Sequence, residues 1–109
     1  MTRITEKSVA RASAPVNQNV LANPKVHTFF GDAREVLLAT SERYDLIFSE
    51  PSNPYRAGIA SLYTREFYEQ AKARLNDDGV LCQWAPTYLA AGDEFADMLA
   101  TFVDVFPNA

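Results

Sequence analysis

The stretch from Tyr44 to Tyr55, which reads YDLIFSEPSNPY, constrains the fold more than any other part of this chain. Residues 45–49 contain the short apolar run Leu46–Phe48, of the kind that a buried parallel strand shows. Pro51 and Pro54 lack the backbone N–H that a paired strand requires. The pattern therefore predicts a strand that ends near residue 50 and continues as a stiff loop.

Two polar residues, Glu50 and Asn53, stand at the start of this loop. Open α/β sheets bind ligands at the carboxyl ends of their strands, so both are candidate site residues. A carboxylate at such a position acts as a base or binds an amine. The alternative for Glu50 is a solvated surface carboxylate, which is the usual state of a glutamate.

The rest of the chain alternates between strand and helix patterns. Towards the amino terminus the sequence predicts a very short strand at 2–5, a helix at 6–14 that Pro15 ends, and a helical turn at 20–22. After these we expect a strand at 26–30, helices at about 33–40, 64–75 and 92–106, and a buried strand at 80–84. This order is typical of an α/β fold in which helices connect the strands of a parallel sheet.

Single residues in these elements have local explanations. Asp32 is expected to cap the helix that follows it, and Thr64 to cap the next one. Gly79 is expected to end that second helix with a positive φ. Cys82 is interpreted as a small core residue and His27 as a surface position, with no metal site.

The length, charge and composition of the chain argue against some classes of function. A chain of 109 residues fits one small domain, and its net charge of −4 with 10 scattered Lys and Arg residues argues against a nucleic-acid partner. An amine or another cation is the easier substrate. No stretch approaches the roughly 20 apolar residues that cross a bilayer, and the lone cysteine fits a reducing cytoplasm, so we expect a cytoplasmic protein with no membrane partner.

Four motifs in order carry a resemblance to a known family: Gly31–Arg34, Tyr44–Pro54, Leu62–Tyr68 and Asp78–Trp84. Together they resemble the spermidine synthase family of polyamine aminopropyltransferases over roughly residues 20–107. The resemblance implies a Rossmann-like fold of the class I S-adenosylmethionine methyltransferase type. It also implies aminopropyl transfer from decarboxylated S-adenosylmethionine, as co-substrate, to a polyamine-type amine, without a metal.

The resemblance assigns roles to three residues of the nucleotide and reaction sites. Asp32 matches the acidic residue that accepts a hydrogen bond from the adenine amino group, with the backbone of Ala33 beside it. Glu50 matches the catalytic aspartate that deprotonates the attacking amine. The ligand role of Asp32 is compatible with its capping role.

Three more residues are implied on the substrate side. Asn53 matches a second aspartate that helps to hold the polyamine. Tyr63 lies where the loop over the substrate meets the next helix. Gln83 falls in a region where the family uses a glutamine.

The chain departs from the family at two of these positions, because the family has aspartate where Glu50 and Asn53 stand. A charge-assisted hydrogen bond is roughly twice as strong as a neutral one, and with Asn53 one formal negative charge is missing from the place where a polycation would bind. The loss of this charge favours an alternative, a methyltransferase that uses S-adenosylmethionine itself.

The glycine-rich turn that cradles the cofactor in the family has no counterpart before Gly31. We therefore expect residues 1–109 to form a single, incomplete catalytic domain that lacks the first strand. The missing strand would leave unpaired edges, which predicts a homo-oligomer through sheet edges. A third hypothesis is an inactive fragment or an interaction module.

Overall fold

The computed structural model describes residues 8–51, 58–87 and 92–109. The chain divides into two compact units, Met1–Asp32 and Ala33–Ala109. The prediction for Asn53 lies outside the described residues, as does the strand predicted at 2–5.

The first unit is built from short helical pieces. Residues 8–12 are helical, and η1 is a 3-10 turn over Val20–Ala22, which confirms the helical turn predicted there. The Asn17 side-chain amide donates to the carbonyl of Ala10 at 2.7 Å and ties the segment that follows the helix back to it. Gln18 and Asn19, which lie between the two pieces, have positive φ angles of 57° and 51°, a left-handed conformation that residues other than glycine adopt infrequently.

The strand predicted at 26–30 is wrong. These residues have no ladder partner among the described residues, and the Phe29 side chain is 78 % exposed. An alternating pattern shows that a segment fits a sheet, but a strand forms only when a neighbouring strand pairs with it.

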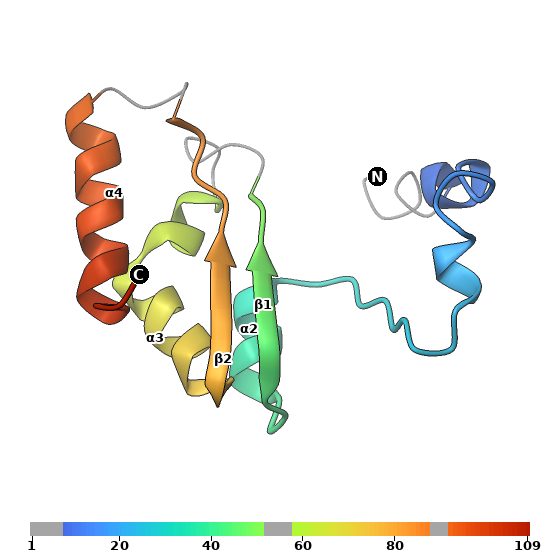
Figure 1. The fold of residues 1–109 in the computed structure, drawn as a ribbon, viewed down its shortest axis with the longest axis horizontal. Helices are drawn as coiled ribbons and strands as arrows, with labels where there is room; N and C mark the ends of the chain where they lie inside the picture. Colours follow the sequence, from blue (N-terminus) through green and yellow to red (C-terminus); the bar gives the residue numbers. More distant parts are fainter. Residues whose placement is uncertain (1–7, 52–57, 88–91) are drawn as a thin grey trace. The chain divides into compact units, whose positions relative to one another are not determined.

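The second unit is a βαβ arrangement with helices added at both ends (Figure 1). Strands β1 (Tyr44–Ser49) and β2 (Leu75–Gln83) are parallel and are connected through η2 (Ala60–Tyr63) and α3 (Arg65–Ala73). Helix α2 (Ala33–Ala39) precedes β1, and α4 (Gly92–Val105) follows β2. The predicted α/β class is thereby confirmed, with a two-stranded parallel sheet among the described residues.

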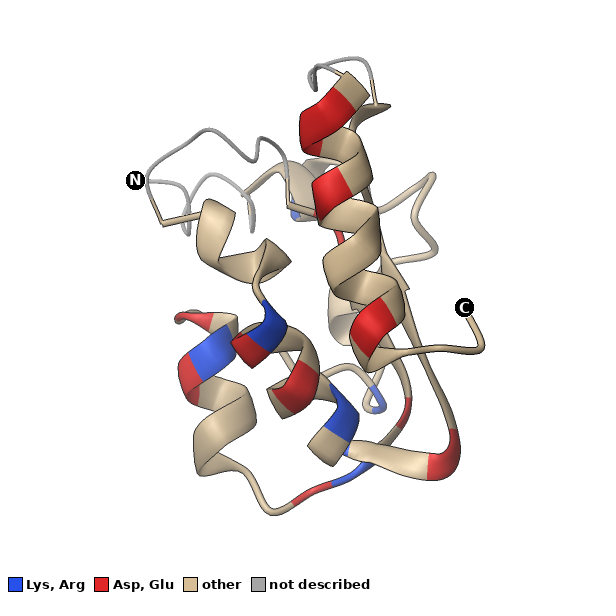
Figure 2. Cartoon of the chain, turned by 90° about the vertical axis from the view of Figure 1, so that its left-hand side faces the viewer, with Lys and Arg blue, Asp and Glu red and all other residues tan. Residues whose placement is uncertain are grey.

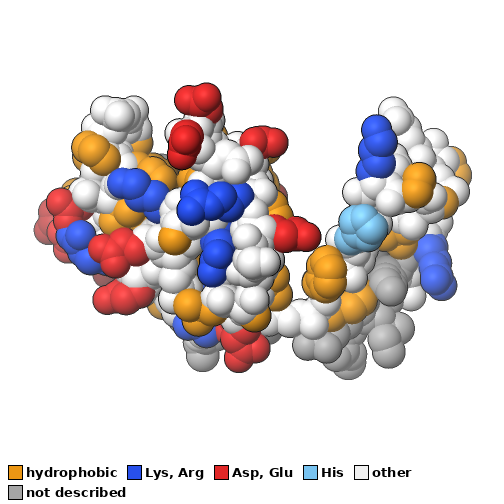
Figure 3. Space-filling model, turned by 90° about the horizontal axis from the view of Figure 1, so that it is seen from below, with side chains coloured by type: hydrophobic (Ala, Val, Ile, Leu, Met, Phe, Trp, Pro, Cys, Tyr) orange, Lys and Arg blue, Asp and Glu red, His pale blue; other side chains and the backbone are white. Residues whose placement is uncertain are grey.

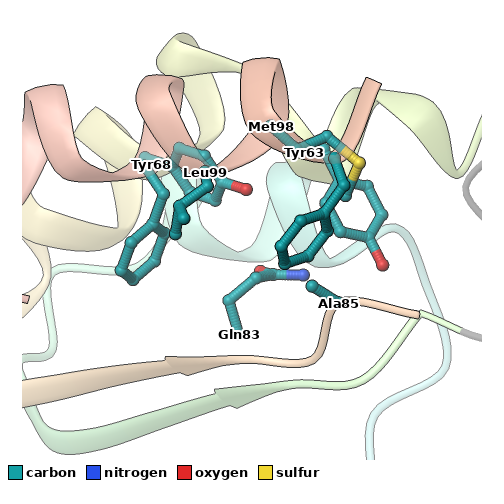
Figure 4. A pocket seen from close by; sticks show the side chains of 8 residues that line it. Tyr63, Tyr68, Gln83, Ala85, Met98 and Leu99 are labelled. Carbon is teal, nitrogen blue, oxygen red and sulfur yellow. The ribbon is translucent and has the colours of Figure 1, made fainter. Parts of the chain in front are cut away.

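The core of this unit lies between the sheet and the described helices, which Figure 4 shows on one side of the two strands. It consists of Leu37, Phe67, Tyr68, Ala71, Leu75, Leu81 and Val105. The ring of Tyr68 contacts Phe102 of α4 edge-on, with 5.1 Å between the ring centroids. Phe102 in turn stacks on Phe106, with 5.2 Å between their centroids. The helix predicted at 92–106 therefore packs on α3 through aromatic residues.

The opposite face of the sheet carries exposed apolar side chains. Leu46, Phe48 and Val80 are 60 %, 59 % and 57 % exposed, and Cys82 is exposed as well. The prediction of strands buried on both faces is wrong, and so is the prediction that Cys82 is a core residue. Successive strand side chains alternate between faces, and the described helices of this unit cover only the face that Ile47 and Leu81 occupy.

Helix α3 begins as predicted. The Thr64 hydroxyl oxygen accepts a hydrogen bond from the backbone N–H of Phe67 at 3.3 Å, which makes Thr64 the N-cap. The helix ends at Ala73, and the Nε of Arg74 donates to the carbonyl of Leu37 in α2 at 2.9 Å. This bond joins the ends of two helices that contact the same side of the sheet.

Gly79 is not the helix terminator that the sequence predicts, because it lies inside β2 and its φ is not positive. The strand pairing jumps from Tyr44↔Leu75 to Leu46↔Val80, so residues 76–79 bulge out opposite Asp45. A Cβ at position 79 would lie 2.9 Å from the carbonyl oxygens of both Asn76 and Tyr44. Glycine is required at position 79 because the backbone of β1 approaches it closely. This contact joins residues that are distant in the sequence.

We predict that Gly79→Ala lowers the free energy of unfolding by about 1–3 kcal/mol, because the added methyl group must displace two backbone carbonyls. Urea unfolding followed by circular dichroism measures the change. Gly92→Ala is the matched control, since a Cβ at that position meets nothing within 4 Å. Equal effects of the two substitutions would contradict this account of the bulge.

Charged side chains lie on the outer surfaces of the second unit. Acidic residues are spaced along α4 (Figure 2), and Arg65 of α3 pairs with Asp104 there and with Glu69 on its own helix at 3.8 Å. None of the helices in the described part of the chain is long and apolar enough to cross a membrane.

Candidate functional site

The carboxyl ends of β1 and β2 lie side by side. Ser49 pairs with Gln83, and the N–H of Trp84 donates to the carbonyl of Ser49 at 2.8 Å. The two strands therefore stay hydrogen-bonded one residue beyond the end of β2. Glu50 comes next and is exposed, whereas the following Pro51 is buried. The candidate base therefore lies at the edge of the sheet where α/β proteins bind ligands, next to an anchored proline.

Tyr63 and Gln83, both predicted as substrate residues, meet at one backbone carbonyl. The Tyr63 hydroxyl donates to the carbonyl oxygen of Trp84 at 3.0 Å, and Gln83 Nε2 donates to the same oxygen at 3.1 Å. Burial raises the pKa of the Tyr63 phenol, and a hydrogen bond from Gln83 offsets part of this effect. Tyr63 is therefore a neutral donor at physiological pH.

A cavity of about 140 Å³ opens beside these residues, between α4 and the end of β2. Its walls are mainly apolar, and its lining residues are Tyr63, Tyr68, Gln83, Ala85, Phe95, Met98, Leu99 and Phe102. Figure 4 shows Gln83 projecting from the strand towards Met98 and Leu99 of the helix above it. A cavity of this size accommodates a small apolar group, as engineered cavities of about 150 Å³ do.

The side-chain oxygen of Gln83 is the unusual atom of this cavity, because it is buried and accepts no hydrogen bond. An unsatisfied buried acceptor costs on the order of 1–3 kcal/mol. A ligand with an N–H or O–H group would satisfy this atom. The cavity thus combines apolar walls with one available acceptor, which suits an aliphatic chain that ends in a donor.

The residues of α3 and α4 that line this cavity were not predicted as site residues. Tyr68, Phe95, Met98, Leu99 and Phe102 recur in the sequence at helical spacings, which are typical of residues that pack in a core. The same spacing that makes a stripe also places these side chains towards β2. Periodicity alone cannot distinguish a filled helix interface from one that leaves a cavity.

Asp32 and Ala33 lie at the junction of the two units. Asp32 is the last residue of the first unit and is partly buried, and Ala33 begins both the second unit and α2. Asp32 thus precedes the first helical residue, which is the position that a capping residue occupies. The predicted adenine contacts therefore come from a short segment, separate in sequence from Tyr63 and Gln83.

A second hollow of about 580 Å³ lies at the amino ends of the strands. Arg43 and Lys72 line it, but both already donate to backbone carbonyls, at 3.1 Å to Leu75 and at 2.8 Å to Val105. Figure 3, which views this end, shows basic and acidic side chains intermingled. These two cations hold elements of the fold together.

Within residues 8–51, 58–87 and 92–109, no group of three or more His, Cys, Asp or Glu side chains is arranged to hold a metal ion.

We predict a loss of stability at alkaline pH that depends on Tyr68. Burial, with a smaller contribution from Tyr63, raises the pKa of Tyr68 from 10.0 to about 12. The unfolded chain then releases this proton at lower pH than the folded chain, so the stabilisation is complete below pH 10 and is lost as the pH rises towards 12. In the Tyr68→Phe variant this contribution is absent.

Urea unfolding of both proteins from pH 7 to 11 tests this. The difference in unfolding free energy between wild type and Tyr68→Phe should stay constant to about pH 9.5 and then fall by about 1 kcal/mol by pH 11. Parallel curves over the whole range would show that Tyr68 titrates alike in the folded and unfolded chains.

Comparisons with known proteins give a consistent result. The family model described as spermine/spermidine synthase domain matches residues 8–109. A polyamine aminopropyltransferase of Clostridium perfringens is 36 % identical over 73 residues, which cover 67 % of this chain and 25 % of that protein. The polyamine aminopropyltransferase of Lachnospira eligens is 34 % identical, over the same fractions of the two chains. That of Corynebacterium efficiens is 33 % identical over 80 % of this chain and 17 % of its own length. No solved structure matches.

The chain spans about a quarter of the length of the first of these curated relatives.

Proposed function

The chain belongs to the spermine/spermidine synthase family, and on this premise we propose that it is part of a catalytic domain that transfers an aminopropyl group from decarboxylated S-adenosylmethionine to an amine. The observation that carries the proposal is the family match over residues 8–109, which includes all the predicted site residues. The polyamine aminopropyltransferases among its relatives support the same reaction class.

We further propose that residues 1–109 contribute the carboxyl-side part of a Rossmann-like domain of the class I methyltransferase type. The parallel β1–β2 pair with its connecting α3 is the unit from which such sheets are built. The first strand and the glycine-rich turn of that fold would lie outside this chain.

Glu50 is proposed as the general base. The amine nitrogen of the acceptor attacks the methylene carbon beside the sulfonium, the carbon–sulfur bond breaks, and methylthioadenosine leaves as a neutral thioether. The proton lost by the nitrogen passes to the Glu50 carboxylate. The exposed position of Glu50 at the end of β1 supports this role, because an acceptor can reach it from solvent.

The substrate side is proposed to comprise Asn53, Tyr63 and Gln83. Tyr63 and Gln83 are joined through the Trp84 carbonyl, and the cavity beside them has the apolar walls that the methylene groups of an aliphatic amine need. Catalysis would then consist mainly of positioning the amine for in-line attack.

On the donor side, Asp32 is proposed to accept a hydrogen bond from the adenine amino group, with the backbone of Ala33 beside it. The partly buried position of Asp32 before α2 is compatible with this role. The chain has no glycine before Gly31, so the methionine-derived part of the donor would be held by other residues of the whole protein.

The experiment is a chimaera in which this chain replaces the matching segment of the Clostridium perfringens relative. With decarboxylated S-adenosylmethionine and a diamine, the chimaera should release methylthioadenosine. Glu50→Gln should lower kcat on the order of 10²–10⁴-fold, because a general base contributes about that much. Glu50→Asp should retain activity, since it keeps the carboxylate.

Glu42→Gln is the matched control, since Glu42 is an exposed glutamate before β1, at the opposite end of the strand from Glu50. Undiminished turnover in Glu50→Gln would remove Glu50 from the mechanism. Methyl transfer with S-adenosylhomocysteine as product would favour the methyltransferase, for which the neutral Asn53 argues. A folded chimaera that releases neither product would contradict the proposal and favour an interaction module.

A further inference from the structure

The cavity beside Gln83 offers a ligand a polar contact but no charge. The lining residues that the structure describes are tyrosine, glutamine, alanine, phenylalanine, methionine and leucine, none of which is ionised at neutral pH. The Tyr68 phenol belongs to this uncharged lining, because burial raises its pKa to about 12. Asp93, Glu94 and Asp97 of α4 are exposed and do not line the cavity. The described lining therefore supplies no carboxylate that could pair with a cation.

The sequence around the ends of the two strands is also poor in acids. No Asp or Glu stands between Glu50 and Glu66, or between Asp78 and Asp93. The segments that follow β1 and β2 thus contain a single carboxylate, Glu50, which the proposed function uses as the base. A second positive charge on the acceptor would find no acidic partner in these segments.

Gln83 presents one free acceptor to the cavity. Its Nε2 donates to the Trp84 carbonyl oxygen at 3.1 Å, and because a carbonyl oxygen only accepts, the amide nitrogen must face it. The side-chain oxygen therefore points the other way (Figure 4), where it is buried without a partner. The Tyr63 hydroxyl gives its only proton to the same carbonyl at 3.0 Å, so it does not compete for a ligand.

These features discriminate between the groups that can end an aliphatic amine. A terminal ammonium, which keeps its charge below about pH 10, would be buried here without a counter-ion. A methyl end would suit the apolar walls but would leave the Gln83 oxygen unsatisfied. A hydroxyl end brings no charge and donates one hydrogen bond to that oxygen.

We infer that the acceptor is an amino alcohol, whose amine is held at Glu50 and whose hydroxyl enters the cavity and donates to Oε1 of Gln83. The inference rests on the proposed function, which makes this ligand the acceptor. Glu50 directly follows Ser49, the ladder partner of Gln83, so the base and the cavity lie at the same edge of the sheet. A chain of about four carbons fits a cavity of about 140 Å³.

The reaction leaves the hydroxyl unchanged. The amine nitrogen forms the new bond to the methylene carbon of decarboxylated S-adenosylmethionine, the carbon–sulfur bond breaks, and Glu50 takes the proton from nitrogen. The role of Gln83 is to select and position the acceptor through its far end.

Three acceptors test the inference in the chimaera described above. They are butyl chains that carry an amine at one end and a hydroxyl, a methyl or a second amine at the other. At neutral pH, kcat/KM should fall in that order, by about tenfold or more between the hydroxyl and the second amine, because the buried ammonium is unpaired.

Two substitutions of Gln83 locate the selectivity. Gln83→Glu places a carboxylate beside the end of the acceptor and should shift the preference to the diamine. Gln83→Met removes the acceptor oxygen and should make the hydroxyl and methyl ends equivalent. The matched control is Gln70→Glu, since Gln70 also has a buried side-chain oxygen without a partner but does not line the cavity. This control should keep the wild-type order, and circular dichroism checks the fold of each variant.

A binding measurement on the isolated chain examines the cavity without turnover. The methyl resonance of Met98, which lines the cavity, is followed by NMR during titration with butanol or with butylammonium chloride. It should shift with butanol and saturate at a concentration on the order of 1 mM, and it should not move with butylammonium.

A wild-type chimaera that prefers the diamine to the amino alcohol would overturn the inference, and so would an order of acceptors that Gln83→Glu leaves unchanged. Equal shifts of the Met98 resonance with butanol and with butylammonium would also overturn it. If no acceptor released methylthioadenosine while the Met98 shift remained selective for butanol, the proposed function would be contradicted and the preference of the cavity for a hydroxyl would be supported.

Discussion

The parallel pairing of β1 with β2 is the interaction on which the rest of the second unit depends. The pairing places Ile47 and Leu81 side by side on the face of the sheet against which the helices pack. It also aligns the carboxyl ends of the strands, so that Glu50 follows β1 and Gln83 is the last residue of β2. Because α3 forms the connection between the two strands, its buried residues Phe67, Tyr68 and Ala71 are placed by the same pairing. The core and the candidate site therefore share one structural origin.

The sequence predicted those elements whose signals are local. The strand at 45–49 ends before the prolines, Thr64 caps α3 through its own side chain, and α4 begins at Gly92. In each case the deciding groups lie within one turn or one strand of the element that they define. The resemblance to the family also depends on short motifs, and the family match confirmed it.

The predictions that were wrong depended on contacts between distant parts of the chain. Residues 26–30 have a strand pattern but no paired neighbour in the described structure, and Gly79 is fixed by the approach of the Tyr44 carbonyl from another strand. Cys82 was assigned to the core because apolar runs usually belong to strands that are covered twice. Pattern alone says which face of a strand a residue occupies, and says nothing of whether another layer covers that face.

The contacts within the candidate site also depend on residues that are distant in the sequence. Tyr63 and Gln83 were chosen by resemblance, and the structure shows them to donate to one acceptor, the carbonyl oxygen of Trp84. That shared acceptor gives the backbone after β2 a redundancy, since either side chain by itself holds the carbonyl in place when the other is engaged elsewhere. One of these anchors comes from η2 and the other from β2 itself, so a substitution that removes either side chain still leaves the first peptide after the strand tethered.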